Sequence, residues 1–291
     1  MAVRNLVFYS YFLGTLIKGR VMSVDQLKEY YEESSHRFWN PQAGMIGRDL
    51  HIYPLLDGLS GTVLEYGCGA GSFLLGLAKE DRFSECIAVD ISEQALSLVG
   101  KAWGDLGTGN KNKVKLVMPQ DDLLPTIPDS SVDVIVSLAT IEHVINPYVV
   151  IDELHRVARD NAVFVCCVPN YAYIKHVLQL AFGIQPRTGT DDPVENWRNV
   201  GWDGMHIHTF TKSSLSVLLK DCGWNPVKWS GWGQKLNGLG FEILRRRFPG
   251  KLSGEITAVC RKVPRSTPIS GRNKPANLSP SAAQRKAGDR G

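Results

Sequence analysis

The 291-residue sequence lacks several features that would place it in a class at once. None of its six cysteines belongs to a C-x-x-C pair, which argues against zinc and thioredoxin-like chemistry. Its body also lacks an excess of positive charge. Residues 263–291 carry six cations and one anion, so removing their +5 from the overall +4 leaves −1 for residues 1–262. A dedicated nucleic-acid binder needs a basic surface, and we therefore expect no nucleic-acid partner.

A long apolar run is missing as well. The N-terminal run Leu6–Ile17 spans about 12 residues, whereas a membrane-spanning helix needs ~20. Arg4, Lys18 and Arg20 flank this run, and no A-x-A cleavage site of a signal peptide follows it. Two interpretations of residues 1–22 stay open: a helix that packs on the domain, and an interfacial helix that rests on an anionic membrane.

The remaining composition is that of an ordinary globular protein. Hydrophobic residues make up 43% and charged residues 21% of the chain, which is long enough for one domain with an insertion. Unpaired cysteines inside predicted strands indicate a reduced compartment. We expect a cytoplasmic protein, with peripheral contact to the inner membrane face under the second interpretation of residues 1–22.

The stretch from Thr62 to Asp90 organises the chain. A short apolar strand ends in E-Y-G-C-G-A-G, and a helical pattern begins at once. Glycines remove the Cβ atoms that would keep a backbone away from a ligand. The next predicted strand ends in Asp90, 19 residues after Gly71, close to the ~20 expected for an acid that binds ribose hydroxyls. The pattern predicts a nucleotide-type site.

The E-x-G-x-G-x-G run, which starts at Glu65, resembles motif I of the class I S-adenosylmethionine-dependent methyltransferases. The V-D-I-S-x-x-A-L run around Asp90 is similar to their motif II, and Q-D-D-L at 120–123 and the p-d-x-S-x-D stretch at 128–133 also match. The resemblance implies S-adenosylmethionine as cofactor. It implies these cofactor-binding residues: Glu65, Tyr66, Gly67, Cys68, Gly69, Gly71, Asp90, Ile91, Asp121, Asp122, Leu123 and Leu138. Asp122 is our choice over Asp121 for the acid that accepts from the adenine amine.

The fold that follows is α/β: a doubly wound, mostly parallel, seven-stranded Rossmann-like sheet. We expect an N-terminal helical segment at 1–60, the methyltransferase domain at 61–262 and a disordered basic tail at 263–291. The domain carries an insertion at 170–211 after strand five, which we interpret as a substrate lid. Later strands are expected at 226–230 and 255–261, with a helix at 236–248 between them.

A second motif follows the fourth predicted strand, in which A-T-I-E-H ends at His143. Ubiquinone-pathway O-methyltransferases, which this chain resembles, carry E-x-x-E-H there, and those residues are linked to a divalent metal. Because the first acid is absent here, only Glu142 and His143 remain, and we predict no metal. Histidine suits a general base near neutral pH, so His143, with His206 and His208 of the insertion, are the candidate catalytic residues.

The sequence favours a methyltransferase that acts on a small-molecule acceptor, such as a lipid or glycan precursor, with oxygen as the expected acceptor atom. A second hypothesis is a catalytically inactive cofactor-binding partner, because the V-P-N and I-H-x-x-T runs resemble the methionine-biosynthesis protein MetW. A third, a nicotinamide-dependent oxidoreductase, is disfavoured by Ser72 and Asp122. The acceptor and the oligomeric state are not encoded in any recognisable motif.

Overall fold

The computed structural model describes residues 24–38, 44–45, 47–107, 111–189, 203, 205–233, 243–245 and 247–264. The predictions for residues 1–22, part of the insertion at 170–211, the tail after 264 and most of the helix at 236–248 lie outside these residues. No helix among the described residues is long and apolar enough to cross a membrane.

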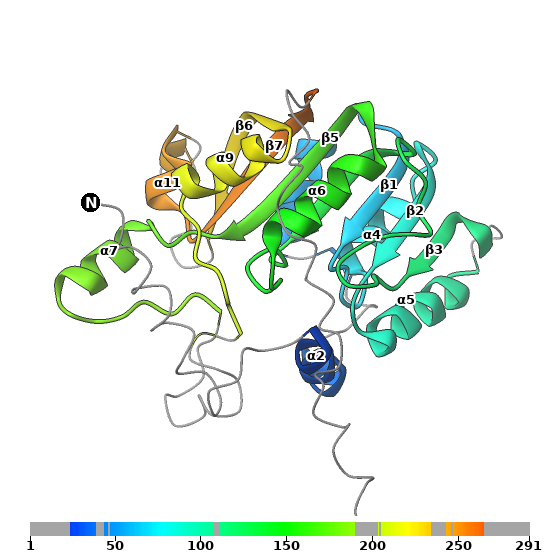
Figure 1. The fold of residues 1–291 in the computed structure, drawn as a ribbon, viewed down its shortest axis with the longest axis horizontal. Helices are drawn as coiled ribbons and strands as arrows, with labels where there is room; N and C mark the ends of the chain where they lie inside the picture. Colours follow the sequence, from blue (N-terminus) through cyan, green and yellow to red (C-terminus); the bar gives the residue numbers. More distant parts are fainter. Residues whose placement is uncertain are drawn as a thin grey trace, which may run out of the picture.

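A seven-stranded sheet forms the centre of the molecule, in the order β3-β2-β1-β4-β5-β7-β6 (Figure 1). The strands from β3 to β5 are parallel, and β7 runs antiparallel to both β5 and β6. The strands are β1 Gly61–Tyr66, β2 Phe83–Val89, β3 Val114–Val117, β4 Val132–Leu138, β5 Ala158–Pro169, β6 Trp224–Trp232 and β7 Glu255–Lys262. The predicted doubly wound, mostly parallel sheet is confirmed.

Helices cover both faces of the sheet, and each interface is a separate apolar core. One core joins residues of α6 and α9 to one face, and the other joins residues of α4 and α5 to the opposite face. The described helices are α2 Val24–Phe38, α3 Arg48–Ile52, α4 Ser72–Ala78, α5 Glu93–Asp105, α6 Pro147–Val157, α7 Ile174–Ala181, α9 Lys212–Asp221 and α11 Pro249–Leu252, with the 3₁₀ turns η2 Tyr53–Leu56 and η3 Lys111–Lys113.

Local sequence explains where these helices begin. Ser92 caps α5 by accepting a hydrogen bond from the Ala95 amide. At the start of α9, Thr211 and Ser214 form a reciprocal capping box. Each cap sets the residue at which its helix begins.

The strand order reverses between β1 and β4, and this reversal creates the crevice of the fold. From β1 the chain proceeds outward to β2 and β3, then returns to the other side of β1 for β4 and β5. Loops at the carboxyl ends of β1 and β4 therefore part in opposite directions, and in open α/β sheets ligands bind where this happens. Helix α2 lies beyond those strand ends (Figure 1).

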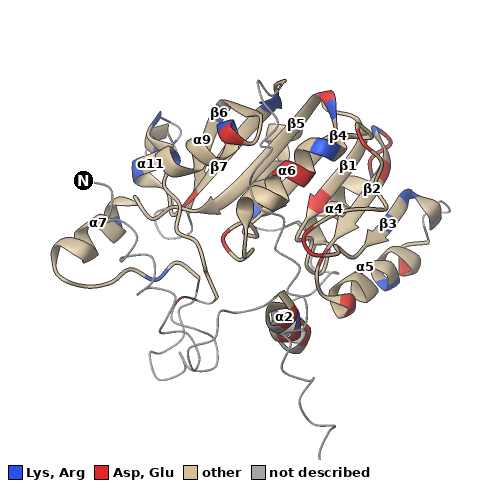
Figure 2. Ribbon diagram, in the orientation of Figure 1, with Lys and Arg blue, Asp and Glu red and all other residues tan. Residues whose placement is uncertain are grey.

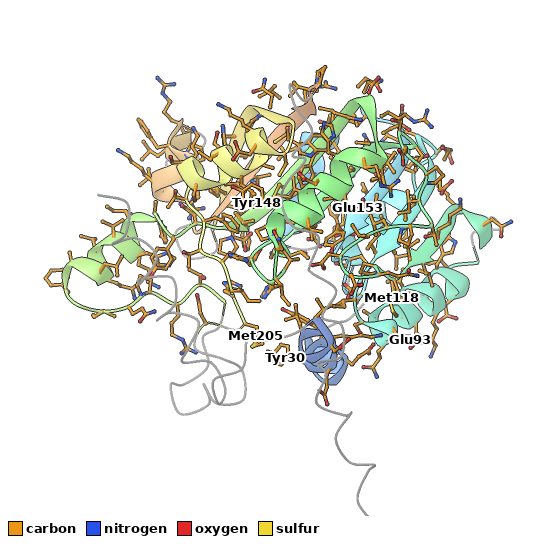
Figure 3. All side chains as sticks on the ribbon, viewed as in Figure 1. Tyr30, Glu93, Met118, Tyr148, Glu153 and Met205 are labelled. Carbon is orange, nitrogen blue, oxygen red and sulfur yellow. The ribbon has the colours of Figure 1, made fainter. Side chains whose placement is uncertain are left out.

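The insertion after β5 leaves the body and then returns to it. Helix α7 projects away from the sheet and carries Lys175 as its one charged residue (Figure 2). The chain comes back at Ile207 and His208, whose amides both donate to the carbonyl of Glu142, at 2.8 and 3.0 Å. Met205 of this returning segment lies on the same side of the molecule as Tyr30 of α2 (Figure 3). The end of the insertion is thereby fixed beside the turn after β4.

Candidate functional site

The glycine-rich loop between β1 and α4 is shaped by two close approaches. Gly67 has φ +76°, and a Cβ there would lie 2.2 Å from the Thr140 side chain in the turn after β4. Gly71 has φ +77°, and a Cβ there would lie 2.7 Å from Val99 on α5. The first glycine lets two loops meet at the crevice. The second lets α4 pack against α5, and Gly71 itself does not line the cavity described below.

Asp90 joins the loop to the next helix. One carboxylate oxygen accepts from the Gly69 amide at 2.8 Å and the other from the Ser92 amide at 3.0 Å. Burial raises the pKa of the Asp90 carboxyl, although these amides oppose the shift. Each carboxylate oxygen keeps a second lone pair, so Asp90 can still accept from ribose hydroxyls.

Glu65 lies beneath the loop, where its Oε2 accepts from the Leu74 amide in the first turn of α4 at 3.0 Å. Burial, with the nearby Asp49 carboxylate, raises the pKa of Glu65 well above its usual range. Glu65 therefore supports the loop and faces the cavity at the same time.

Of the two acids after β3, Asp122 reaches the cavity. Its Oδ1 accepts from the Tyr66 hydroxyl at 3.4 Å, and both Asp121 and Asp122 have positive φ. Neither Asp121 nor Leu123 lines the cavity, and Leu123 is 44% exposed. Of the two acids, Asp122 alone lines the cavity, and its role toward adenine stays a prediction.

Ten of the predicted residues line one cavity of about 440 Å³, within the range of roughly 300–1,000 Å³ typical of small-molecule sites. The wall includes a glycine cradle, four carboxyl side chains and apolar side chains, which are the kinds of group that the adenosyl and methionyl parts of S-adenosylmethionine require. The predicted lining residues are Glu65, Tyr66, Gly67, Cys68, Gly69, Asp90, Ile91, Asp122, Leu138 and His143.

Helix α2 closes the cavity through contacts that the sequence did not reveal. The Glu32 carboxylate accepts from the Ser92 hydroxyl at 3.0 Å and from the Gln94 amide at 3.2 Å. An acid at this position also interacts favourably with the positive end of the α5 dipole. Tyr31 of the same helix lines the cavity and packs edge-on against His143, with ring centroids 5.7 Å apart.

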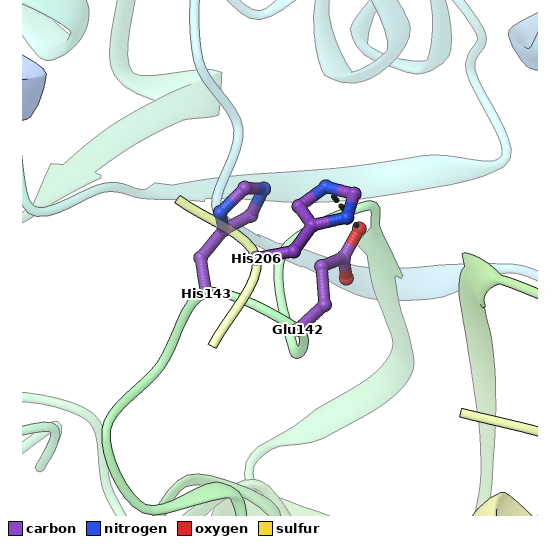
Figure 4. Close-up of side chains that lie close together, drawn as sticks. All are labelled: Glu142, His143 and His206. Atoms are coloured by element: carbon purple, nitrogen blue, oxygen red, sulfur yellow. Dashed lines mark ion pairs between the residues drawn. The ribbon is translucent and has the colours of Figure 1, made fainter. Parts of the chain in front are cut away.

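A second polar group adjoins the cavity, formed by Glu142, His143 and His206 (Figure 4). The rings of the two histidines are 4.6 Å apart, and Nε2 of His206 lies 3.9 Å from Oε1 of Glu142. Burial, with the adjacent His206, lowers the pKa of His143 to about 3, and burial lowers that of His206 to about 4. Both rings are therefore neutral near pH 7. Burial raises the pKa of Glu142 to about 8.

The three candidate catalytic histidines differ in their position relative to the cavity. His143 lines the cavity and His206 lies next to it, whereas His208 faces the Ile145 carbonyl, with its Nε2 at 3.3 Å. The expectation of no metal considered only the two donors at 142 and 143. The structure adds His206 to them, which no local motif indicated.

Comparison with known proteins gives a consistent assignment of class. A family model for a methyltransferase domain matches residues 26–228. The human tRNA N(3)-cytidine methyltransferase METTL6 is 28% identical over 169 residues, which are 57% of this chain and 56% of that protein. This chain thus spans about half the length of that curated relative.

Two of the solved structures that match this chain illustrate the shared fold. A SAM-dependent methyltransferase from Methanosarcina mazei aligns with a TM-score of 0.53 at 21% identity, over 74% of this chain and 98% of that one. The [4+2]-cyclase SpnF aligns with a TM-score of 0.59 at 13% identity, over 83% of this chain and 97% of that one. At such identities these likenesses concern the fold alone.

Proposed function

Because the chain belongs to the methyltransferase domain family and is an S-adenosylmethionine-dependent methyltransferase, we propose that it methylates an oxygen of a small, lipid-like acceptor. The cofactor, when bound, supplies a methyl group on a positively charged sulfur. The residues of this chain have to align the acceptor oxygen with the methyl group and exclude water. They also have to accept a hydrogen bond from the acceptor hydroxyl.

The observation that carries the proposal is a pair of polar groups on the wall that α2 closes. The Tyr31 hydroxyl is buried and has no hydrogen-bond partner among the described residues. His143 directs Nδ1 to the Met205 carbonyl at 3.1 Å, so its Nε2 carries the lone pair. A hydroxyl group can accept from Tyr31 and donate to His143 at once.

This pair favours oxygen over nitrogen. A hydroxyl oxygen has two lone pairs, so one can accept from Tyr31 while the other attacks the methyl group. A neutral amine has a single lone pair, and accepting from Tyr31 would use the pair that the attack needs.

Helix α7 supports a lipid-like acceptor. Apolar side chains along and after this helix are exposed, and Phe182 is 81% exposed. Several exposed apolar side chains on one helix are a feature of protein and membrane interaction sites. Lys175 on α7 would favour an anionic surface. The exposed members are Ile174, Val177, Leu178, Leu180, Phe182 and Ile184.

One labelling experiment tests the acceptor class. The protein is incubated with S-adenosylmethionine carrying a labelled methyl group and with separated lipid, aqueous metabolite and RNA fractions of a cell extract. We expect label in the lipid fraction, held as an ether or ester, and none with Asp90→Ala. Label in RNA, the polymer named for the human relative, would refute the proposal. Cofactor binding without label in any fraction would favour the inactive-partner hypothesis.

The role of Tyr31 has its own test. Tyr31→Phe removes one hydrogen bond, worth about 0.5–1.5 kcal/mol, so we expect kcat/KM for the identified acceptor to fall roughly 2- to 13-fold. Binding of S-adenosylhomocysteine should not change. Equal kcat/KM in both proteins would show that this hydroxyl does not meet the acceptor.

Membrane contact through α7 is tested by flotation with anionic vesicles. Phe182→Ser should weaken binding, because it removes an exposed apolar side chain without disturbing the core. Val227→Ser is the matched control, since Val227 is 55% exposed but lies on β6. Equal flotation of the two variants would show that α7 does not contact the vesicles, and this helix would then no longer support a lipid-like acceptor.

A further inference from the structure

The group Glu142, His143 and His206 combines residues from two distant parts of the chain. Glu142 and His143 lie in the turn after β4, and His206 belongs to the returning segment of the insertion (Figure 4). One ligand atom from each of the three lies within 4.8 Å of the others. The insertion is held there by the amides of Ile207 and His208, which bond to the Glu142 carbonyl.

Hydrogen bonds fix which nitrogen of each ring carries the lone pair. A carbonyl can only accept, so Nδ1 of His143 donates to Met205 and Nε2 is unprotonated. The Thr188 hydroxyl donates its proton to Oδ2 of Asp203 at 2.7 Å. It must therefore accept from Nδ1 of His206, which lies 2.7 Å away. Nε2 of His206 then presents its lone pair to Glu142.

Three groups that offer electron pairs thus face one another. Glu142 is fully buried, and neither of its side-chain oxygens has a hydrogen-bond partner among the described residues. The guanidinium that interacts with it, Arg48, makes its ion pair with Glu255 instead, at 3.5 Å. A buried carboxylate without a donor or a bound cation is unfavourable, so Glu142 stays mostly neutral near pH 7, and a cation bound beside it would stabilise its charged form.

We propose that Glu142, His143 and His206 bind a first-row transition-metal dication such as Zn²⁺. Two imidazoles with one carboxylate is a donor set that suits zinc and its neighbours, whereas Mg²⁺ and Ca²⁺ prefer oxygen ligands. Hydrogen bonds from the second ring nitrogen to Met205 and Thr188 are the kind that orient metal-bound histidines. Donors around tetrahedral Zn²⁺ lie roughly 3.4 Å apart, so small side-chain rotations suffice.

This inference reverses the expectation from sequence, which lacked the third donor. The metal site itself does not depend on the proposed function. Its consequence for the acceptor, given next, does rest on that function. His143 lines the cavity, so the ion would lie at its acceptor end with a coordination position left open. An acceptor oxygen would then meet the ion in place of the imidazole.

Metal binding is measured on the full chain after treatment with a chelator, without any acceptor. Calorimetry and elemental analysis should find one equivalent of Zn²⁺, and Mg²⁺ should bind far more weakly. His206→Ala and Glu142→Gln should each lower the Zn²⁺ affinity by more than the roughly 10- to 100-fold typical of an outer partner. Thr188→Val should lower it by an amount within that range, because it removes the hydroxyl that orients His206.

The matched control is His208→Ala, in the same segment but facing the Ile145 carbonyl; it should bind Zn²⁺ as the unchanged protein does. The proposal is wrong if the folded protein takes up no Zn²⁺, if it prefers Mg²⁺, or if Thr188→Val and His206→Ala both bind normally. Circular dichroism and S-adenosylhomocysteine affinity report folding separately. Zn²⁺ binding without lipid methylation would leave this site standing and refute only the acceptor class.

Discussion

Gly67→Ala tests whether the close meeting of the two loops builds the cofactor site. Gly67 has φ +76°, a conformation that costs a residue with a Cβ about 1–2 kcal/mol. The new Cβ would also lie 2.2 Å from both Cγ2 and Oγ1 of Thr140. Overpacking of this kind costs about 1–3 kcal/mol, so we expect a total loss of about 2–5 kcal/mol in the free energy of unfolding.

Gly58→Ala separates the two contributions. Gly58 has nearly the same φ, +75°, but a Cβ there meets nothing within 4 Å. It should lose only the conformational part, so Gly67→Ala should be less stable by about 1–3 kcal/mol. For a domain of this size that difference is about 2–12 °C in Tm.

Cofactor binding gives a second readout. Gly67 and Thr140 both line the cavity, so moving either should weaken S-adenosylhomocysteine binding at least tenfold by calorimetry, whereas Gly58→Ala should bind normally. Adding Thr140→Ala removes the two atoms at 2.2 Å but leaves the Thr140 Cβ at 2.7 Å, so it should restore part of the loss. Two single variants with equal stability and equal affinity would refute the reasoning.

Three further variants test the surroundings of the same cavity. Asp90→Ala should bind S-adenosylhomocysteine roughly 100-fold more weakly in calorimetry, because hydrogen bonds to a charged group are worth about 1.5–3 kcal/mol each. The control is Glu153→Ala, which removes another acid that accepts from a backbone amide and should lower stability but not affinity. An equal loss of affinity in the two variants would contradict this. Glu65→Gln should gain stability over the unchanged protein as pH rises above about 4.5, by at most about 1.4 kcal/mol per pH unit. The reason is the raised pKa of Glu65, because the native state of the unchanged protein then holds a proton that its unfolded state releases. An equal difference in stability between the two proteins at pH 5 and pH 8 would contradict this. Glu32→Ala should speed hydrogen exchange in residues 24–38, because it removes the bonds that dock α2 on α5; unchanged exchange there would show that other contacts hold the helix.

Much of the sheet was predictable because its signals are local. Buried parallel strands read as short apolar runs, and the predicted run at 255–261 matches β7, Glu255–Lys262. Strand ends are harder to predict: β5 begins at Ala158. The three polar residues that follow, Arg159–Asn161, are exposed, so hydropathy gives no sign of a strand there.

The sequence also predicts which residues lie together on the cofactor side of the site. Its glycines and Asp90 follow strands directly, and the carboxyl ends of parallel strands meet at one rim. Spacing along the chain therefore implies nearness in space. Asp121 and Leu123 show the limit, because the left-handed turn at 121–122 decides which of the neighbouring side chains faces the cavity.

By itself, the sequence determined the family, the sheet and the glycine cradle with its carboxylate, since each depends on a few adjacent residues and on backbone conformations that they permit. Only the tertiary structure decided that Glu32 docks α2 on α5, that Tyr31 meets His143, and that His206 joins Glu142. These contacts join residues far apart in the chain through the return path of a long insertion and the docking of a separate helix. No local pattern encodes that path, because it is fixed by packing and by backbone hydrogen bonds such as those to the Glu142 carbonyl.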